Sequence, residues 1–182
     1  FIMGLTYVKE HFRKENLFLS IAFYSKTEIS DPRFQWLFYD FDSENPQLAI
    51  EKALEFHNSL RKRFGIEAVL VKSGFKGLHV IIPLKRLIDF DSYRYLWSYL
   101  IQPYNFSLVL DQQVCEPRRL QRVPYTFNIK LINGVPHRRL ARVIDIRGKP
   151  IKANDFDWSN YEPLNPDQVP LIKVRFNLPE IK

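Results

Sequence analysis

The chain has 182 residues, near the ~150 typical of one domain, so its length favours a single domain with a sizeable core. Apolar residues make up 46% and charged residues 26%, a balance that excludes a disordered chain. No stretch approaches the ~20 apolar residues of a membrane span, no secretory leader is evident, and Cys115 is a lone cysteine. We therefore expect one cytoplasmic domain over 1–182 with no membrane partner.

Two further expectations concern origin. We expect a prokaryotic, plasmid or viral source, and the start at Phe1 instead of methionine fits a piece of a longer protein.

The positive charge is concentrated in one part of the chain. The formal net charge is +7, yet residues 117–152 hold ten Lys and Arg against Asp145 alone, which leaves the remainder slightly negative. Arginine forks match phosphate oxygens, and neutralised phosphates release counterions, so this stretch suits a polyanion. The alternative is a solvated basic face without a partner.

Hydrophobic periodicity and turn residues divide the chain into short elements. In chain order we expect a helix at 5–14, strands at 17–24 and 36–42, a helix at 46–64, strands at 67–72 and 78–83, a helix at 91–100 and a strand at 107–114. After Asn128 we expect short strands broken at Asn133-Gly134 and at Gly148. Strands dominate the second half, which predicts an α+β fold with mixed or antiparallel sheets flanked by helices.

The helix at 46–64 has the clearest signals. Asn45 is placed as its N-cap, Pro46 suits the first helical position, and Gly65 suits the C-terminal cap. Apolar residues recur at helical spacing from Ala49 to Phe64, so we expect this helix to pack on the sheet.

Two carboxylates close the strand at 36–42. Asp40 and Asp42 lie at i and i+2, so they point to the same face of a strand. Hard cations such as Mg²⁺ and Mn²⁺ prefer oxygen ligands, and the pair could hold one or two of them. The alternative is that the two residues are only the polar end of a strand.

The loop between the strands at 67–72 and 78–83 suits an anion. Gly74 and Gly77 let backbone N–H groups come close to a phosphate, and Ser73, Lys76 and His79 can direct donors at its oxygens. The alternative is a tight hairpin with a solvated lysine.

Four segments together resemble the catalytic motifs of the archaeo-eukaryotic primase superfamily. They are Asp-Phe-Asp at 40–42, Ser-Gly-Phe-Lys-Gly-Leu-His at 73–79, Leu-Asp at 110–111 and Arg-Leu-Gln-Arg-Val-Pro at 119–124. The superfamily includes the small catalytic primase subunit, primase-polymerases and the polymerase domain of bacterial end-joining ligases. The resemblance covers about half the chain and implies a primase-polymerase catalytic core, a modified RRM-like fold.

The resemblance also implies roles for individual residues. It assigns Asp40, Asp42 and Asp111 as the catalytic carboxylates that hold a two-metal Mg²⁺ or Mn²⁺ site. Its implied nucleotide contacts are Ser73, Gly74, Lys76, Gly77, His79, Arg122, Asn128 and Lys130. Asn128 departs from the family pattern, which has a histidine there.

The basic stretch would hold nucleic acid. We expect its backbone contacts to come from Arg118, Arg119, Arg138, Arg139 and Arg142. The implied partners are a single-stranded DNA template, a primer and an NTP or dNTP, with a second primase subunit or a fused helicase as possible further partners. Some members of this superfamily carry a zinc-binding insertion. One cysteine and four scattered histidines do not supply a set of zinc ligands, so we expect a minimal catalytic core without that insertion.

The expected function is template-directed nucleotidyl transfer that synthesises or extends primers on single-stranded DNA. Three alternatives stay open. One is a gap-filling polymerase in end joining or lesion bypass, and another is a non-catalytic primase-fold subunit that binds nucleic acid. The third is a plain RNA-binding domain with an RRM-like sheet, which accounts for the charge and the aromatics but not for the carboxylates and the loop together.

Overall fold

The computed structural model describes residues 16–24 and 31–169. Its helices are α2 (Pro46–Phe64) and α3 (Phe90–Ile101), with short 3₁₀ turns at Gln112–Cys115, Ala153–Asp155, Trp158–Asn160 and Pro166–Gln168. Its strands are β1 (Phe18–Ser20), β2 (Phe23–Tyr24), β3 (Pro32–Phe41), β4 (Val69–Lys72), β5 (Leu78–Ile88), β6 (Leu120–Arg122), β7 (Phe127–Ile132), β8 (Val135–Leu140) and β9 (Arg142–Ile144). Among these residues, no helix is both long and apolar enough to span a membrane.

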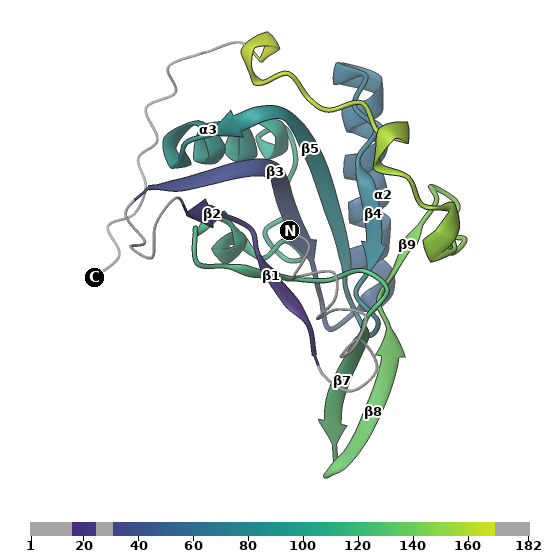
Figure 1. Cartoon of the computed structure of the whole chain (residues 1–182). Coiled ribbons are helices and arrows are strands. Elements are labelled where there is room, and N and C mark those ends of the chain that lie inside the picture. Colours follow the sequence, from purple (N-terminus) through teal and green to yellow (C-terminus); the bar gives the residue numbers. More distant parts are fainter. Residues whose placement is uncertain (1–15, 25–30, 170–182) are drawn as a thin grey trace.

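A five-stranded sheet forms the centre of the fold (Figure 1). Its strand order is β2-β3-β5-β4-β9, and every neighbouring pair is antiparallel. The register places Asp40 of β3 opposite His79 of β5, and His79 opposite Val71 of β4. The expected α+β class with antiparallel sheets is confirmed.

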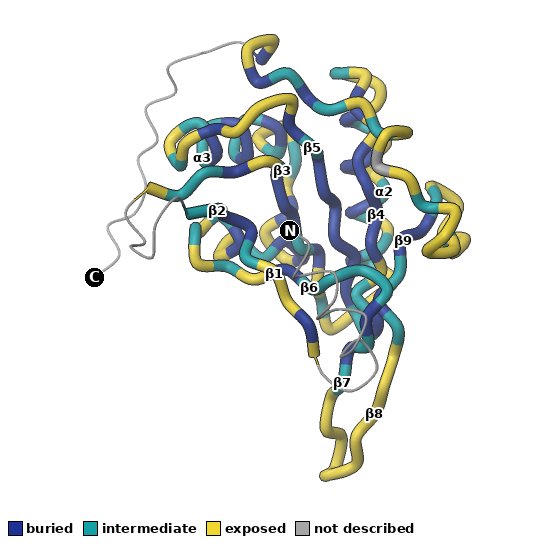
Figure 2. Tube along the Cα trace, viewed as in Figure 1, coloured by how far each residue is buried: buried dark blue, intermediate teal, exposed yellow. Residues whose placement is uncertain are grey.

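Both helices cover the same face of this sheet. The Tyr39 ring of β3 packs edge-on against Phe56 of α2 at 4.8 Å and stacks on Trp97 of α3 at 5.2 Å. The Trp97 indole donates to the Phe38 carbonyl at 2.9 Å, and the Tyr39 hydroxyl donates to the Trp97 carbonyl at 3.1 Å. These groups are buried, and Figure 2 shows the continuous buried band along β3, β5 and β4. Buried aromatics that also satisfy their polar atoms lock the helices to the sheet.

Two small two-stranded ribbons lie outside the central sheet. β1 pairs with β6, and β7 pairs with β8 in a hairpin that projects from the body (Figures 1 and 2). Arg122 lies at the end of β6. The hairpin turn is Asn133-Gly134, and both residues have a positive φ, as expected for such a turn.

Most expected elements are confirmed. The Asn45 side chain accepts hydrogen bonds from the N–H groups of Gln47 and Leu48, and Gly65 ends α2 in the left-handed conformation. The expected strand at 17–24 is divided into β1 and β2, and the expected helix at 5–14 lies outside the described residues.

The expected strand at 107–114 is wrong. The segment forms turns and the 3₁₀ helix Gln112–Cys115, and its only strand-like contact among the described residues is a bridge between Leu110 and Phe41. Val109 and Leu110 are buried through a turn instead of along a ladder, because their N–H groups both donate to the Phe106 carbonyl, whereas Leu108 is exposed.

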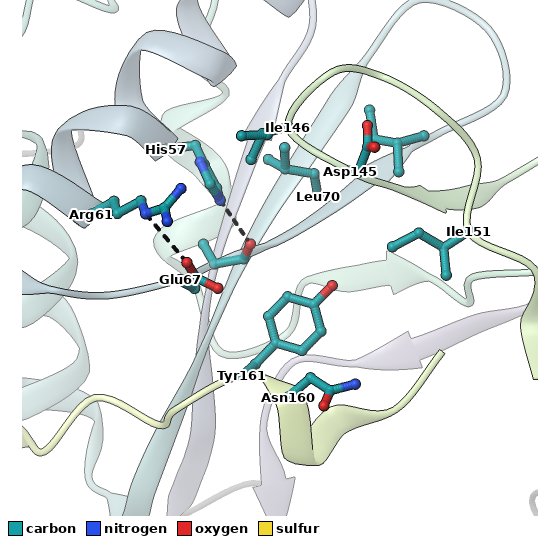
Figure 3. A pocket seen from close by; sticks show the side chains of 11 residues that line it. His57, Arg61, Glu67, Leu70, Asp145, Ile146, Ile151, Asn160 and Tyr161 are labelled. Carbon is teal, nitrogen blue, oxygen red and sulfur yellow. Dashed lines mark hydrogen bonds and ion pairs between the residues drawn. The ribbon is translucent and has the colours of Figure 1, made fainter. Parts of the chain in front are cut away.

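A hollow of about 270 Å³ lies at the β9 edge, on the side that carries α2 (Figure 3). His57 of α2 and Tyr161 contribute to its walls, and an ion pair joins Arg61 to Glu67 at 3.3 Å. The buried His57 ring donates through Nε2 to the Ala68 carbonyl at 3.1 Å. Burial lowers the pKa of His57 below its ordinary 6.5, although the Ala68 carbonyl acts in the opposite direction.

This pKa gives the fold a pH dependence. The unfolded chain takes up a proton near pH 6.5 while folded His57 stays neutral, so the His57 contribution to stability is lost as pH falls below that value. We expect His57→Gln to reduce the loss of unfolding free energy between about pH 7.5 and 5.5, measured by urea denaturation. The exposed His137→Gln is the control and should keep the full dependence. An unchanged profile in His57→Gln would contradict the assignment.

Candidate active site

The end of β3 and a returning loop bring three carboxylates together. Asp40 lies near the end of β3, and Asp42 follows the strand. The N–H of Asp111 donates to the Asp40 carbonyl at 2.9 Å, and the N–H of Asp42 donates to the Val109 carbonyl at 2.8 Å. These two backbone bonds fix the loop beside β3, so residues about 70 positions apart in the sequence share one site.

The carboxylates interact electrostatically. Burial is the main cause that raises the pKa of Asp40, and the nearby charges of Asp42 and Asp111 raise it further, while His79 and Arg119 lower it. Like charges in one partly buried site each disfavour ionisation of the others. A cation bound among them would remove this repulsion.

Two of the three carboxylates already have partners. Arg119 forms an ion pair with Asp111 Oδ2, and the Gln113 N–H donates to Asp111 Oδ1 at 2.9 Å. Asp42 Oδ1 accepts from the Ser43 N–H at 2.9 Å. Within 16–24 and 31–169, no group of three His, Cys, Asp or Glu side chains is drawn together tightly enough to hold a metal ion.

The donor set nevertheless suits a hard divalent cation. All three side chains offer carboxylate oxygens, which Mg²⁺ and Mn²⁺ prefer. Asp40 has a raised pKa that a cation would lower, and Asp42 is exposed enough to turn. Binding by all three would require Asp111 to exchange Arg119 for the metal.

The β4–β5 loop leads directly into β5, the strand that faces Asp40. Ser73 closes this loop, because its N–H and hydroxyl both donate to the Gly77 carbonyl at 3.0 Å. Gly77 is also packed tightly: an added Cβ would lie 2.9 Å from the Phe41 carbonyl oxygen. Only glycine therefore allows the loop to approach the end of β3 this closely.

The stem of the β7–β8 hairpin clamps the loop. The Asn128 amide donates to the Ser73 carbonyl at 2.9 Å, and a Cβ added to Gly74 would lie 3.0 Å from the Arg139 carbonyl oxygen. Phe75 packs under two cations of the hairpin, with Lys130 at 5.2 Å and the Arg139 guanidinium at 5.1 Å from its ring centre. The structure thus places Asn128 as a buried residue that holds the loop.

Lys76 lies in the β4–β5 loop, and His79 lies in β5 opposite Asp40. Lys76 Nζ pairs with the exposed Glu44 at 2.7 Å, across the mouth of the site. His79 is buried, its Nε2 lies 3.6 Å from Asp40 Oδ1, and its Nδ1 has no partner among the described residues. Burial is the main cause that lowers the pKa of His79, which favours the neutral ring.

Arg122 connects β6 to the hairpin. Its guanidinium donates to Asn16 Oδ1 at 2.9 Å and to the Phe127 carbonyl at 3.3 Å, and it lies over the Phe18 ring. Burial lowers the pKa of Arg122 from its ordinary value. The remaining predicted nucleic-acid contacts lie further out, with Arg118 exposed before β6 and Arg138, Arg139 and Arg142 on β8 and β9.

The sequence motifs miss three residues that matter here. Glu44 pairs with Lys76, Asn16 holds both Arg122 and the backbone of Ile129, and Lys72 precedes the loop at the end of β4. Lys72 could have been found, because it directly precedes Ser73. No local pattern indicates Asn16, which lies over 100 residues from its partners.

The fold of this chain is similar to the folds of two solved domains. The chain is similar to the AEP domain of the cyanophage S-2L primase-polymerase, with a TM-score of 0.54, 16% identity, and coverage of 90% of this chain and 73% of that one. It is also similar to the polymerase domain of Mycobacterium tuberculosis ligase D in complex with DNA, with a TM-score of 0.52 and 18% identity. That match covers 70% of this chain and about half (51%) of the ligase D chain. No protein-family profile and no curated protein sequence matches the chain.

This chain has the archaeo-eukaryotic primase fold. The expected resemblance is therefore confirmed at the level of the fold. In this fold, Asp40, His79 and the β4–β5 loop lie at the ends of β3, β4 and β5, and a backbone bond holds Asp111 beside Asp40.

The close approach of Gly77 to β3 can be tested directly. We expect Gly77→Ala to lower the unfolding free energy by about 1–3 kcal/mol, since the Phe41 carbonyl must move to admit the methyl group. Gly148→Ala is the control. None of the described residues lies within 4 Å of its added Cβ, so any loss of unfolding free energy comes only from placing alanine at a φ of 75°. Chemical denaturation measures both. Equal folding stability of Gly77→Ala and the parent chain would contradict the tight contact.

Proposed function

We propose that this chain is a template-directed nucleotidyltransferase that synthesises or extends primers on single-stranded DNA. One observation carries this proposal: Asp40, Asp42 and Asp111 lie close together beside the β4–β5 loop, within a primase fold. A plain binding domain does not require three repelling carboxylates at one place.

The proposed cofactor is Mg²⁺ or Mn²⁺, held by Asp40, Asp42 and Asp111. When bound, such ions activate a primer hydroxyl and neutralise the leaving pyrophosphate. The protein contributes the position of these carboxylates, which the backbone bonds of Asp42 and Asp111 fix against β3. The carboxylates are ligands and not nucleophiles, so the proposal needs no covalent intermediate.

The cations around the loop would bind the triphosphate. Lys76 would exchange Glu44 for phosphate oxygens, and this exposed pair is weak enough to break. Burial favours the neutral ring of His79, whose buried Nδ1 has no partner among the described residues and would donate a hydrogen bond to a phosphate that reaches it. Lys130 extends over Phe75 at the outer edge of the same loop. Asn128 would act by fixing the loop, a positioning role, through its bond to Ser73.

A second candidate is a gap-filling polymerase of end joining or lesion bypass. It is supported by the similarity to the ligase D polymerase domain, which has nearly the same TM-score as the primase-polymerase match. Both candidates share the nucleotidyl transfer chemistry and differ in the nucleic acid that they extend.

Primer extension tests the shared chemistry. We expect Asp40→Asn to lower extension of a labelled primer on a single-stranded template by about 100-fold or more, the scale of losing one electrostatic group from such a site. The measurement uses Mg²⁺ or Mn²⁺, with ribonucleotides and deoxyribonucleotides in separate reactions. Asp167→Asn removes an exposed carboxylate that pairs with Arg86, and it should extend normally.

Substrate choice separates the candidates. Products on an unprimed template would support a primase, whereas products only on gapped DNA would support the end-joining candidate. Mn²⁺ binding, read by electron paramagnetic resonance, should be lost when both Asp40 and Asp42 are alanine. No extension by the parent chain under any condition, together with retained DNA binding, would overturn the enzymatic proposal in favour of a non-catalytic subunit.

A further inference from the structure

A second hollow of about 610 Å³ lies between the hairpin stem and the β9 edge. Its walls include four cations and two apolar side chains: Lys72, Arg138, Arg139, Arg142, Phe127 and Ile144. We call this hollow the basic pocket. No carboxylate lies among its lining residues.

The basic pocket opens on the side of the sheet away from the carboxylates. Lys72 pairs with Leu78 and Arg142 in the register, and Leu78 pairs with Phe41. Residues directly opposite in antiparallel strands share a face, and Phe41 packs on Phe56 of α2. Lys72 and Arg142 therefore lie on the helix-covered face, whereas Asp40 and His79 lie on the other.

The cations of the basic pocket are uncompensated. Among the described residues, none of the four takes part in an ion pair, although Arg139 also lies over the Phe75 ring. Like charges around one hollow repel each other, and a bound anion would relieve that repulsion. Three of the four are arginines, whose forked donors match phosphate oxygens.

The basic pocket also lies within a longer positive track. Its rim includes Gly148 and Pro150, which flank the exposed Lys149, and the hairpin carries Lys130 beyond it. A mononucleotide would leave most of the cations in this track without a phosphate, whereas a polynucleotide carries a phosphate at every nucleotide and can contact them all. Phe127 and Leu140 add apolar wall that suits sugars and bases between the phosphates.

We propose that the basic pocket binds the phosphates of a nucleic acid single strand. This inference rests on the proposed function, because it assumes that the chain acts on nucleic acid. It adds a contact on the far side of the sheet and assigns a role to Lys72. A hollow of this size admits one backbone, whereas a duplex carries its two backbones on the outside of a wide rod. The β4–β5 loop and the hairpin stem separate this strand from the carboxylates.

Binding without catalysis tests the inference. The probe is a labelled oligothymidine of about 20 nucleotides, and fluorescence anisotropy is read in EDTA, without nucleotide, over a range of salt. We expect Lys72→Ala with Arg142→Ala to weaken binding about tenfold and to reduce the salt slope by about 0.7 for each cation removed. Arg142→Lys alone keeps the charge and should lose less affinity than Arg142→Ala.

The matched control is Lys62→Ala with Arg63→Ala, which removes the same charge from exposed residues at the end of α2. Equal weakening in both double variants would overturn the basic pocket, because net charge alone would then explain the loss. Competition by free tripolyphosphate at the same phosphate concentration as the oligonucleotide would also overturn it, in favour of a mononucleotide site.

The two proposals fail in different ways. Strand binding that depends on Lys72 and Arg142, without primer extension by the parent chain, would contradict the enzymatic function and retain the basic pocket. Primer extension by the parent chain, with strand binding unaffected in the Lys72 and Arg142 variant, would contradict only the basic pocket.

Discussion

The antiparallel pairing of β3 with β5 is the constraint on which the rest of the structure depends. It sets Asp40 opposite His79 and, one residue further along, Phe41 opposite Leu78. Because side chains alternate, one face receives the charged residues and the other receives the aromatic contacts with α2 and α3. A slip of one residue would bury Asp40 among aromatic rings and expose Tyr39. The buried packing of Tyr39 against Phe56 and Trp97 thus fixes the register that builds the candidate site.

Charge balance within the site is local. Asp111 pairs with Arg119 and Lys76 pairs with Glu44, while burial and the acidic neighbours raise the pKa of Asp40. Under the proposed function, a metal and a triphosphate would replace these contacts. Since Lys76 and Glu44 are exposed, little free energy opposes their exchange, whereas the Asp111 pair is half-buried and exchanges at greater cost.

Local signals were enough to predict much of this fold. Asn45 and Gly65 marked both ends of α2, and the alternation along β3 placed Asp40 and Tyr39 on opposite faces. Local signals failed at 107–114, because apolar residues that a turn buries, such as Val109 and Leu110, have the composition of a strand. They also gave no indication of the bond from Asn128 to Ser73, which joins residues 55 positions apart. The roles of the three carboxylates came from motif resemblance, and only the backbone bonds of the folded chain explain why Asp111 lies beside Asp40.

The β7–β8 hairpin is anchored at one end only. Asn128 is buried at its base, whereas Leu131 near the tip is 73% exposed. Folding free energy is consequently concentrated at the base, and the turn at Asn133-Gly134 contributes little to it. Evolution or protein engineering can therefore lengthen, shorten or re-sequence the tip at small thermodynamic cost, which makes it the natural place for relatives of this chain to diverge.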